Sequence, residues 1–398
     1  MATLKLKRGH VQPVWTGHPW VYAQAVERME GDAAAGDLVR VIDPSGNDLG
    51  AGFYSPSSAI VLRILTRREG VEIDRAWFQN RFEQAQSHRA KWGLPSEGTT
   101  GYRLVHAEGD GIPGLIVDRL GDTLSVQFLT IGMKLRTELI VSALVSLFSP
   151  TVVLDRTPKQ VGALEGFSAT RSVLYGPEGQ PFRFRERGLY FEVPFEIGQK
   201  TGFYFDQRTL RERVEHLSAG QRVLDVCSFI GPFALSAARG GATEVIAVDE
   251  SSMALEVGAS CARLNGLEAK IAFVRRDARK MLEDVASKND GRGYDVVVVD
   301  PPRLAPTRAS RDKALATYQS YAAAGCKATA DGGILVFCSC SAAIDLQLLT
   351  RALAQGAARA GADAVVIERV LQGIDHPVPA AFAEGLYLKT LIAKVNKR

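Results

Sequence analysis

The residues best suited to chemistry stand directly after apolar runs in the second half of the chain. Asp300 follows the run Tyr294–Val299 and precedes two prolines, and Cys340 ends a Cys-Ser-Cys segment. Two prolines cannot continue a strand and they fix the backbone, which suits a carboxylate at the lip of an active site. A cysteine at a strand tip suits a nucleophile, whereas Cys338 is interpreted as a small buried hydrophobe.

Acidic residues also end the apolar runs that come before. Asp249 follows Val245–Val248, and Asp277 follows Ala272–Arg275 with one residue between. A carboxylate after the second strand of a doubly wound sheet binds ribose hydroxyls, and one after the third can accept from an adenine amino group. Each acid taken alone is better explained as a cap of the following helix. Several in order at successive strand ends favour a ligand site.

The loop after the first of these strands, Arg222–Val226, contains a single glycine, Gly231, and Pro232 begins the next helix. It lacks the GxGxxG pattern of a dinucleotide site, which argues against NAD. An uncharged or zwitterionic ligand has no pyrophosphate to bind, so the loop that holds it needs fewer glycines. By itself the loop is weak evidence.

Strands and helices alternate from about residue 187 onward, and this order predicts a doubly wound parallel sheet. The predicted strands include Glu244–Val248, Tyr294–Val299 and Gly332–Cys338, whose apolar residues suit burial on both faces. A ligand of such a sheet lies beyond the carboxyl ends of the strands. The segment Phe203–Phe205 is also predicted to be a strand.

Residues 1–68 read as short strands separated by turns, which indicates a small β-barrel or sandwich. Trp15, Trp20 and Tyr22 lie near Lys7 in the sequence. These aromatic residues form either the core and lip of the barrel or a stacking surface for RNA. The first interpretation is favoured, because most aromatic side chains are core residues.

Residues 72–92 predict a helix that connects this module to a small α+β unit, with strands at Tyr102–Val105, Leu115–Asp118 and Thr123–Leu129. Met133–Phe148 is predicted to be one apolar helix. No catalytic constellation is evident in this unit.

Composition excludes several classes of protein. The chain has 398 residues, of which 46% are hydrophobic and 23% are charged, with a net charge of +4. This is globular composition, and the slight basic excess is compatible with a polyanionic partner. Five cysteines without a CxxC pair indicate a reducing compartment and no zinc site. No signal peptide or membrane span is evident, so we expect a cytoplasmic protein with no membrane partner and no metal.

Several motifs together resemble one family. They are GQKTGFYFDQR (198–208), LDVCSFIGPF (224–233), VDES (248–251), RDA (276–278), VDPPRL (299–304), CSCS (338–341), and DHP with EGLYLK (375–377, 384–389). The chain thus resembles the S-adenosylmethionine-dependent ribosomal RNA large-subunit cytosine-5 methyltransferases that carry an N-terminal PUA domain. The resemblance covers essentially the whole chain and implies three domains. They are a PUA-like RNA-binding domain at 1–70, a connector helix with a central α+β domain at 71–186, and a class I, Rossmann-like methyltransferase domain at 187–398.

The resemblance also implies roles for individual residues. Cys340 corresponds to the nucleophile and Asp300 to the acid that positions the target base, while Asp249 would hold the ribose hydroxyls and Asp277 the adenine. The implied binding site for S-adenosyl-L-methionine comprises Lys200, Thr201, Phe203, Phe205, Asp206, Arg208, Cys227, Ser228, Phe229, Gly231, Asp249, Asp277, Ala278 and Asp300. Two positions depart from the family pattern: Pro232 replaces a second glycine, and Cys227 replaces a phenylalanine.

The predicted partner is ribosomal RNA of the large subunit, with a homodimer left open. Arg303 is a candidate phosphate contact, and Lys7, Trp20 and His376 are further candidates for RNA contact. A structural role for His376 is at least equally favoured.

The predicted reaction forms 5-methylcytosine in 23S ribosomal RNA through a Cys340 adduct at cytosine C6. Two alternatives stay open. A guanine-N7 methyltransferase of similar fold would need no nucleophilic cysteine, so Cys340 favours cytosine. A non-catalytic RNA-binding assembly factor is supported only by the altered glycine loop.

Overall fold

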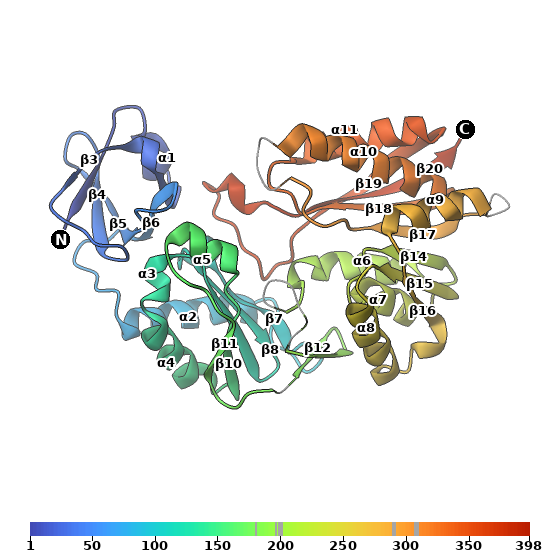
Figure 1. Ribbon diagram of the computed structural model, residues 1–398, viewed down its shortest axis with the longest axis horizontal. Coiled ribbons are helices and arrows are strands. Elements are labelled where there is room, and N and C mark those ends of the chain that lie inside the picture. The colour runs from blue at the N-terminus through green and yellow to red at the C-terminus, as the bar shows by residue number, and fades with distance from the viewer. Residues whose placement is uncertain (180, 196, 198–201, 289–291, 306–309) are drawn as a thin grey trace. The chain divides into compact units, whose positions relative to one another are not determined.

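The computed structural model describes residues 1–179, 181–195, 197, 202–288, 292–305 and 310–398. Contacts between residues divide the chain into two compact units (Figure 1). The first comprises Met1–Gly188, the described part of Gly198–Phe205, and Ile374–Gly385. The second comprises Leu189–Ile197, Asp206–Gly373 and Leu386–Arg398. Neither unit is therefore a continuous stretch of chain.

The first unit begins with a six-stranded sheet in the order β2-β6-β5-β4-β1-β3. Its elements are β1 (Thr3–Leu6), α1 (Val11–Trp15), β2 (Trp20–Tyr22), β3 (Val26–Glu30), β4 (Leu38–Ile42), β5 (Asp48–Tyr54) and β6 (Ile60–Thr66). Alternation of apolar and polar residues directs Val39 and Val41 of β4 into a core that also contains Leu6 and Leu62. The short strands and turns thus form the small β module that the sequence predicts.

A five-stranded sheet with the order β11-β10-β9-β8-β7 follows in the same unit. The elements of this part of the chain are α2 (Arg75–Ala90), β7 (Gly101–His106), β8 (Leu115–Leu120), β9 (Thr123–Phe128), α3 (Ile131–Lys134), α4 (Thr137–Phe148), β10 (Val152–Asp155), α5 (Lys159–Glu165), β11 (Ser172–Tyr175) and β12 (Phe182–Glu186), of which β12 lies outside the five-stranded sheet. Asp74 caps α2 by accepting from the Trp77 N–H at 2.8 Å. Phe78 and Phe82 of this helix are fully buried against the sheet.

The prediction of one helix over Met133–Phe148 is wrong. Two helices, α3 and α4, replace it, and Arg136 between them has a non-helical backbone conformation. The Arg136 guanidinium donates to the carbonyl oxygens of Gly36 and Gly132, each at 3.0 Å. This side chain ties the break to the neighbouring β module.

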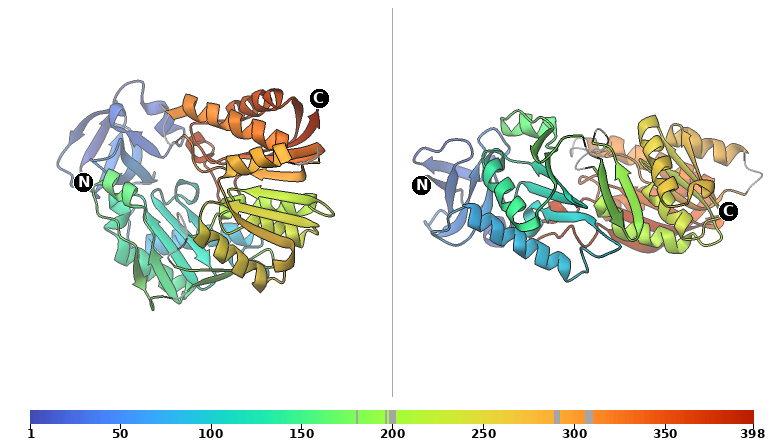
Figure 2. Two further views of the ribbon diagram at one scale, coloured as in Figure 1. Left: turned by 45° about the vertical axis from the view of Figure 1, so that its right-hand side comes forward. Right: turned by 90° about the horizontal axis from the view of Figure 1, so that it is seen from below.

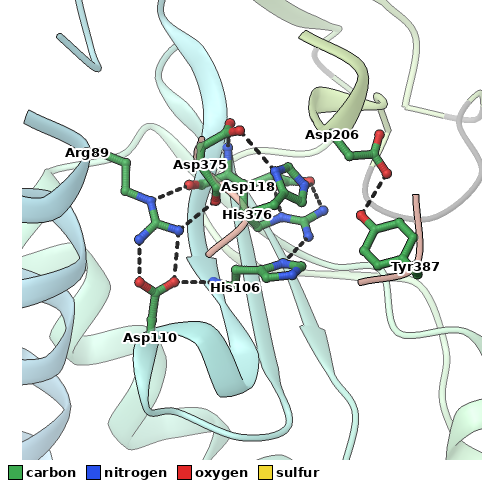
Figure 3. A network of polar contacts seen from close by, with 9 residues as sticks. Arg89, His106, Asp110, Asp118, Asp206, Asp375, His376 and Tyr387 are labelled. Atoms are coloured by element: carbon green, nitrogen blue, oxygen red, sulfur yellow. Dashed lines mark hydrogen bonds and ion pairs between the residues drawn. The ribbon is translucent and has the colours of Figure 1, made fainter. Parts of the chain in front are cut away.

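A buried set of charged residues, here named the ionic network, anchors the segment 374–385 within the first unit (Figure 3). Its members are Arg89, Arg103, His106, Asp110, Asp118, Asp375 and His376. Arg89 pairs with both carboxylate oxygens of Asp110 and donates to the Asp375 carbonyl at 2.7 Å. The Asp375 carboxylate accepts from the backbone N–H of Arg103 at 2.9 Å and from the His376 ring at 2.9 Å. The network therefore joins residues far apart in sequence.

The second unit is built on a seven-stranded sheet with the order β16-β15-β14-β17-β18-β20-β19. Its strands are β13 (Leu189–Val193), which lies outside this sheet, β14 (Arg222–Val226), β15 (Glu244–Asp249), β16 (Ile271–Arg275), β17 (Tyr294–Val299), β18 (Thr329–Ser339), β19 (Ala362–Leu371) and β20 (Lys389–Lys397). The first five strands of the sheet, β16 to β18 in this order, are parallel, and β20 is antiparallel to both of its neighbours. The sheet thus has the predicted doubly wound arrangement with two added strands.

Helices cover both faces of this sheet (Figures 1 and 2). They are α6 (Arg208–Leu217), α7 (Pro232–Arg239) and α8 (Ser252–Leu264) on one face, with α9 (Ala278–Lys288), α10 (Arg311–Ala328) and α11 (Leu346–Arg359) on the other. Because both faces are covered, the central strands are mostly apolar, and Val296–Val299 is fully buried. None of the helices in the described part of the chain combines the length and apolar character needed to cross a membrane.

The strand predicted at Phe203–Phe205 is not formed. Residues 202–204 have no regular structure, and a 3₁₀ turn begins at Phe205. The rings of Phe203 and Phe205 instead pack against Phe184, with centroids 5.0 Å and 5.5 Å away. Burial in this aromatic cluster fixes the segment without any strand pairing.

Candidate active site

The loop between β14 and α7 is held in an uncommon backbone conformation. Cys227, Phe229 and Gly231 have positive φ angles of 61°, 54° and 71°. The Phe229 N–H donates to the Asp249 carboxylate at 2.8 Å, which holds the loop against the end of β15. A Cβ at Gly231 would lie 3.0 Å from the Phe273 ring, so glycine is required there. Strain of this kind costs about 1–3 kcal/mol per residue and is typical of ligand-binding sites.

Carboxylates converge around this loop from the ends of four parallel strands. They are Asp225, Asp249, Asp277 and Asp300, here named the acidic cluster. Burial raises the pKa of the Cys227 thiol, and the negative charges of all four members raise it further. The strand-end acids singled out from the sequence therefore do lie close together.

Asp225, which sequence reasoning did not assign to the site, is the most enclosed member of the acidic cluster. Burial raises the pKa of its carboxyl well above the usual range, and the neighbouring Asp300 and Asp249 add to this effect. Oδ2 accepts from the Ala234 N–H at 3.2 Å, while Oδ1 has no hydrogen-bond partner among the described residues. The hydroxyl of Ser228 is likewise buried without a partner there. Buried polar atoms are normally bonded, so both indicate a missing ligand.

Two members of the cluster also support the local backbone. Asp277 accepts from the Lys280 N–H at 2.8 Å in the manner of a helix cap. Asp249 accepts from the Ser251 N–H at 2.9 Å as well as from the loop. Asp277 therefore does cap the following helix, which is the alternative interpretation of these aspartates. A carboxylate has about four lone-pair sites, so each can still accept from a ligand.

Gln207 is a site residue that sequence reasoning missed, although it lies in the GQKTGFYFDQR motif. Its Nε2 donates to Asp300 Oδ2 at 3.0 Å, and the side chain is buried. Its Oε1 has no hydrogen-bond partner among the described residues. Nearby in the chain, Asp206 accepts from the Tyr387 hydroxyl at 2.7 Å (Figure 3). The polar residues of this motif therefore reach the rim of the acidic cluster.

Cys340 directly follows β18 and is partly exposed, whereas Cys338 within the strand is fully buried. Cys338 accepts a hydrogen bond from the Thr390 hydroxyl at 3.4 Å, and burial raises the pKa of its thiol. Burial also raises the pKa of Tyr318 to about 12, and both Cys340 and Asp300 contribute. Cys340 and Asp300 thus share one electrostatic environment, as expected for neighbouring strand ends.

The remaining predicted cofactor residues have diverse positions. Lys200 and Thr201 lie outside the described residues. Phe203 and Phe205 are enclosed in the aromatic cluster, and Arg208 and Ala278 are buried at the starts of α6 and α9. Their predicted contact with the cofactor stays a prediction.

The four predicted RNA contacts differ in exposure. Arg303 is exposed, and so is Lys7, whose Nζ donates to the Gln24 carbonyl at 3.0 Å. Trp20 is half-buried; its indole donates to Glu108 at 2.7 Å and packs against Phe382. His376 is buried in the ionic network, so its imidazole offers RNA no surface and fits the structural interpretation.

Comparisons with known proteins agree with this geometry. A family model described as a PUA-like domain matches residues 4–67, and one described as an S-adenosylmethionine-dependent methyltransferase matches residues 168–388. A protein of Klebsiella pneumoniae (strain 342) named ribosomal RNA large subunit methyltransferase I is 36% identical over 396 residues, covering 98% of each chain. Its namesake from Yersinia pestis bv. Antiqua (strain Angola) is 35% identical over 395 residues, covering 98% of this chain and 99% of the relative.

Solved structures share the fold. A structure of SMU.776, described as a methyltransferase complexed with SAH, superposes with a TM-score of 0.86 at 20% identity, covering 99% of this chain and 100% of that one. A methyltransferase from Streptococcus mutans superposes with a TM-score of 0.84 at 19% identity and the same coverage. The predicted fold class is thereby confirmed.

The described residues suit S-adenosylmethionine as the cofactor. Its sulfonium and ammonium groups are cations, and Asp225, Asp249 and Asp277 have no ion pair with any cation among the described residues. Its hydroxyl and amino groups are donors, and the unpaired Asp225 Oδ1 and Ser228 Oγ can accept. The chain belongs to the S-adenosylmethionine-dependent methyltransferases, in the family of the ribosomal RNA large subunit methyltransferases I.

Proposed function

We propose that this enzyme methylates C5 of a cytosine in large-subunit ribosomal RNA, with Cys340 as the nucleophile and Asp300 as the residue that holds the base. The observation that carries the proposal is the partly exposed Cys340 at the end of β18, in the same electrostatic environment as Asp300. Methylation of a ring nitrogen needs no such thiol.

C5 of cytosine is a poor carbon nucleophile, which explains the need for a thiol. Addition of the Cys340 sulfur to C6 breaks the C5–C6 π bond and makes C5 electron-rich. The cofactor supplies the methyl group from its sulfonium. Loss of the C5 proton and expulsion of the sulfur restore the aromatic ring, so the cysteine ends as it began.

Asp300 is suited to hold the N3/N4 edge of the base. Two prolines follow it, and Gln207 donates to its Oδ2 at 3.0 Å, so the carboxyl group is held in place by its neighbours. A carboxyl group beside N3 can hold a proton on N3, which balances the negative charge that the ring gains as sulfur adds. The target base must leave its helix to reach such a site.

The test replaces Cys340 by alanine, with Cys338→Ala as the matched control from the same segment. Cys340→Ala should abolish methyl transfer to RNA while S-adenosylhomocysteine still binds in calorimetry. Cys338→Ala should keep most of the activity, because that thiol is buried. Normal turnover by Cys340→Ala would exclude the C5 mechanism, and mass spectrometry of the modified nucleoside would then reveal guanine N7 methylation.

The wider assignments belong to the same proposal. We propose a PUA-like domain at 1–70, a central domain at 71–186 and a catalytic domain at 187–398. We also propose that the enzyme acts in the cytoplasm and that two copies can form a homodimer. Arg303 and Lys7 are the proposed RNA contacts best supported by exposure. A catalytically inactive assembly factor would bind no S-adenosylhomocysteine in calorimetry.

A further inference from the structure

The turn that carries Cys340 has a buried lysine behind it. Lys389 opens β20 and pairs in register with Ser339, the last residue of β18. Its side chain is only 4% exposed, and its Nζ donates to the Ser341 carbonyl at 2.9 Å. The ammonium is thus bonded to the backbone one residue beyond the thiol.

The carboxylates that normally neutralise a buried lysine are absent from this position. Among the described residues Lys389 forms no ion pair, and its Nζ donates to a neutral carbonyl. Two titratable groups act on it electrostatically: Cys340, and Asp345, whose carboxylate caps α11 by accepting from the Leu348 N–H. Burial lowers the pKa of Lys389 to about 8 in spite of both. A buried cation is costly unless a charge balances it.

The shape of the turn does not require this cation. Ser339 donates to the Tyr318 hydroxyl at 2.8 Å, and that hydroxyl lies 3.1 Å from Ser341 Oγ. Ser341 Oγ also accepts from the Ala305 N–H at 3.1 Å. These neutral bonds already hold the turn, so the charge of Lys389 needs another explanation.

We propose that Lys389 is a positioning residue whose ammonium group favours the thiolate form of Cys340. The S–H bond breaks and the proton passes to solvent water, which leaves a thiolate beside the ammonium. When the sulfur adds to the base, its negative charge moves into the ring, and when the sulfur is expelled the ion pair is restored. With a pKa of about 8, Lys389 is mostly protonated at pH 7, and positive charge beside a thiol lowers the pKa of that thiol below its ordinary value of about 8.5.

Among the described residues, Tyr318 and Cys338 are titratable groups that interact electrostatically with Cys340, and Asp300 acts on both of them. Burial raises the pKa of Tyr318 and of Cys338, so both are neutral near pH 7. Asp300 is an anion that opposes thiolate formation. Among these neighbours, Lys389 alone supplies positive charge.

The inference rests on the proposed role of Cys340 as nucleophile, but its test needs neither RNA nor cofactor. Alkylation of Cys340 by iodoacetamide is followed by peptide mass spectrometry between pH 6 and 10, with the slow labelling of Cys227, whose thiol pKa is raised above this range, as the internal reference. Lys389→Met should shift the midpoint of the Cys340 profile up by at least about one pH unit, which is a roughly tenfold slower reaction at pH 7. The Cys227 profile should not change.

Two further variants separate charge from shape. Lys389→Gln keeps a donor for the Ser341 carbonyl but removes the charge, so it should behave like Lys389→Met, whereas Lys389→Arg should restore the low midpoint. Lys389→Gln decides the question if Lys389→Met fails to bind S-adenosylhomocysteine. Equal midpoints in wild type and Lys389→Gln, or a wild-type midpoint near that of a free thiol, would overturn the inference. A shifted midpoint without cytosine methylation would overturn only the proposed function.

Discussion

The two units each bury several charged side chains, but the charges are balanced differently. In the ionic network of the first unit, Arg89 and Arg103 face Asp110 and Asp118 in direct ion pairs (Figure 3). In the acidic cluster of the second unit, Asp225 has one bonded oxygen and one without a described partner. Buried charges are stable only when paired. The arginines and aspartates of the first set thus pair within the chain, whereas Asp225, Asp249 and Asp277 of the second have no ion pair among the described residues and suit a cationic ligand.

This contrast distinguishes a structural role from a functional one where composition does not. Both sets are buried and both contain perturbed pKa values, at His106 in one and Asp225 in the other. Perturbed titration alone would mark both as candidate active sites. Whether the partners are supplied by the chain is the better criterion.

The largest expected effect comes from breaking the ionic network. Arg103→Ala leaves Asp118 buried without its cation, and breaking such a pair costs about 3–5 kcal/mol. Chemical denaturation should show this loss. The control is Arg28→Ala, because the Arg28 pairs with Glu27 and Glu30 are exposed and should contribute less than about 1 kcal/mol. Similar losses in both variants would contradict the assignment.

Acid should weaken the same network through His106. Burial lowers the pKa of this imidazole well below 6.5, and the neighbouring His376 lowers it further. Below pH 6.5 the unfolded chain then takes up a proton that the folded chain does not. The free energy of unfolding therefore decreases as the pH is lowered. The slope from this group is at most about 1.4 kcal/mol per pH unit. Denaturation between pH 5 and 8 should show a shallower slope for His106→Gln, and an unchanged slope would refute the prediction.

The acidic cluster should respond in the opposite way. Asp225→Asn keeps an acceptor for the Ala234 N–H and removes a carboxyl whose pKa is raised by burial. A raised pKa means that ionisation above its ordinary value costs stability, so this variant should be at least as stable as wild type at pH 7. Affinity for S-adenosylhomocysteine should fall about tenfold, roughly 1.4 kcal/mol, in calorimetry. A destabilised variant with normal affinity would make the cluster structural.

The smallest effect is expected at the exposed edge of the second unit. Arg303 follows the Asp300 loop and is solvent-exposed. Arg303→Ala should weaken RNA binding a few-fold. The plot of log affinity against log salt concentration should become less steep, by the amount expected for the loss of about one phosphate contact. Filter binding at several salt concentrations measures both. Unchanged S-adenosylhomocysteine binding is the control, and an unchanged salt slope would exclude a phosphate contact.

Much of the acidic cluster follows from the sequence, because parallel strands end at one edge of a sheet. Asp249, Asp277 and Asp300 each follow an apolar run, and that position alone brings them together. Asp225 and Gln207 lie inside recognised motifs, but their roles depend on which of their atoms stay unpaired. Such detail requires packed side chains.

The residues that the antiparallel strand β20 places near the site could not be predicted from the sequence. Lys389 is 49 residues from Cys340 in the chain, and only the pairing of β20 with β18 places it behind the CSCS turn. His376 is a similar case, since a histidine beside a proline looks like an exposed loop residue until the ionic network surrounds it. Phe203 and Phe205 alternate as residues of a strand do, but packing of their rings in the aromatic cluster outweighs this local preference for a strand.

The interruption of both units along the chain has a consequence for synthesis. Domains usually fold in the order in which they leave the ribosome, but the first unit needs the segment Ile374–Gly385. Until Asp375 emerges, the Arg103 N–H and one donor of Arg89 lack the acceptors that they have in the finished protein. By then most of the second unit has been translated. The N-terminal half of the chain is therefore completed only after most of the second unit has been made, and loss of residues 374–398 would affect both units.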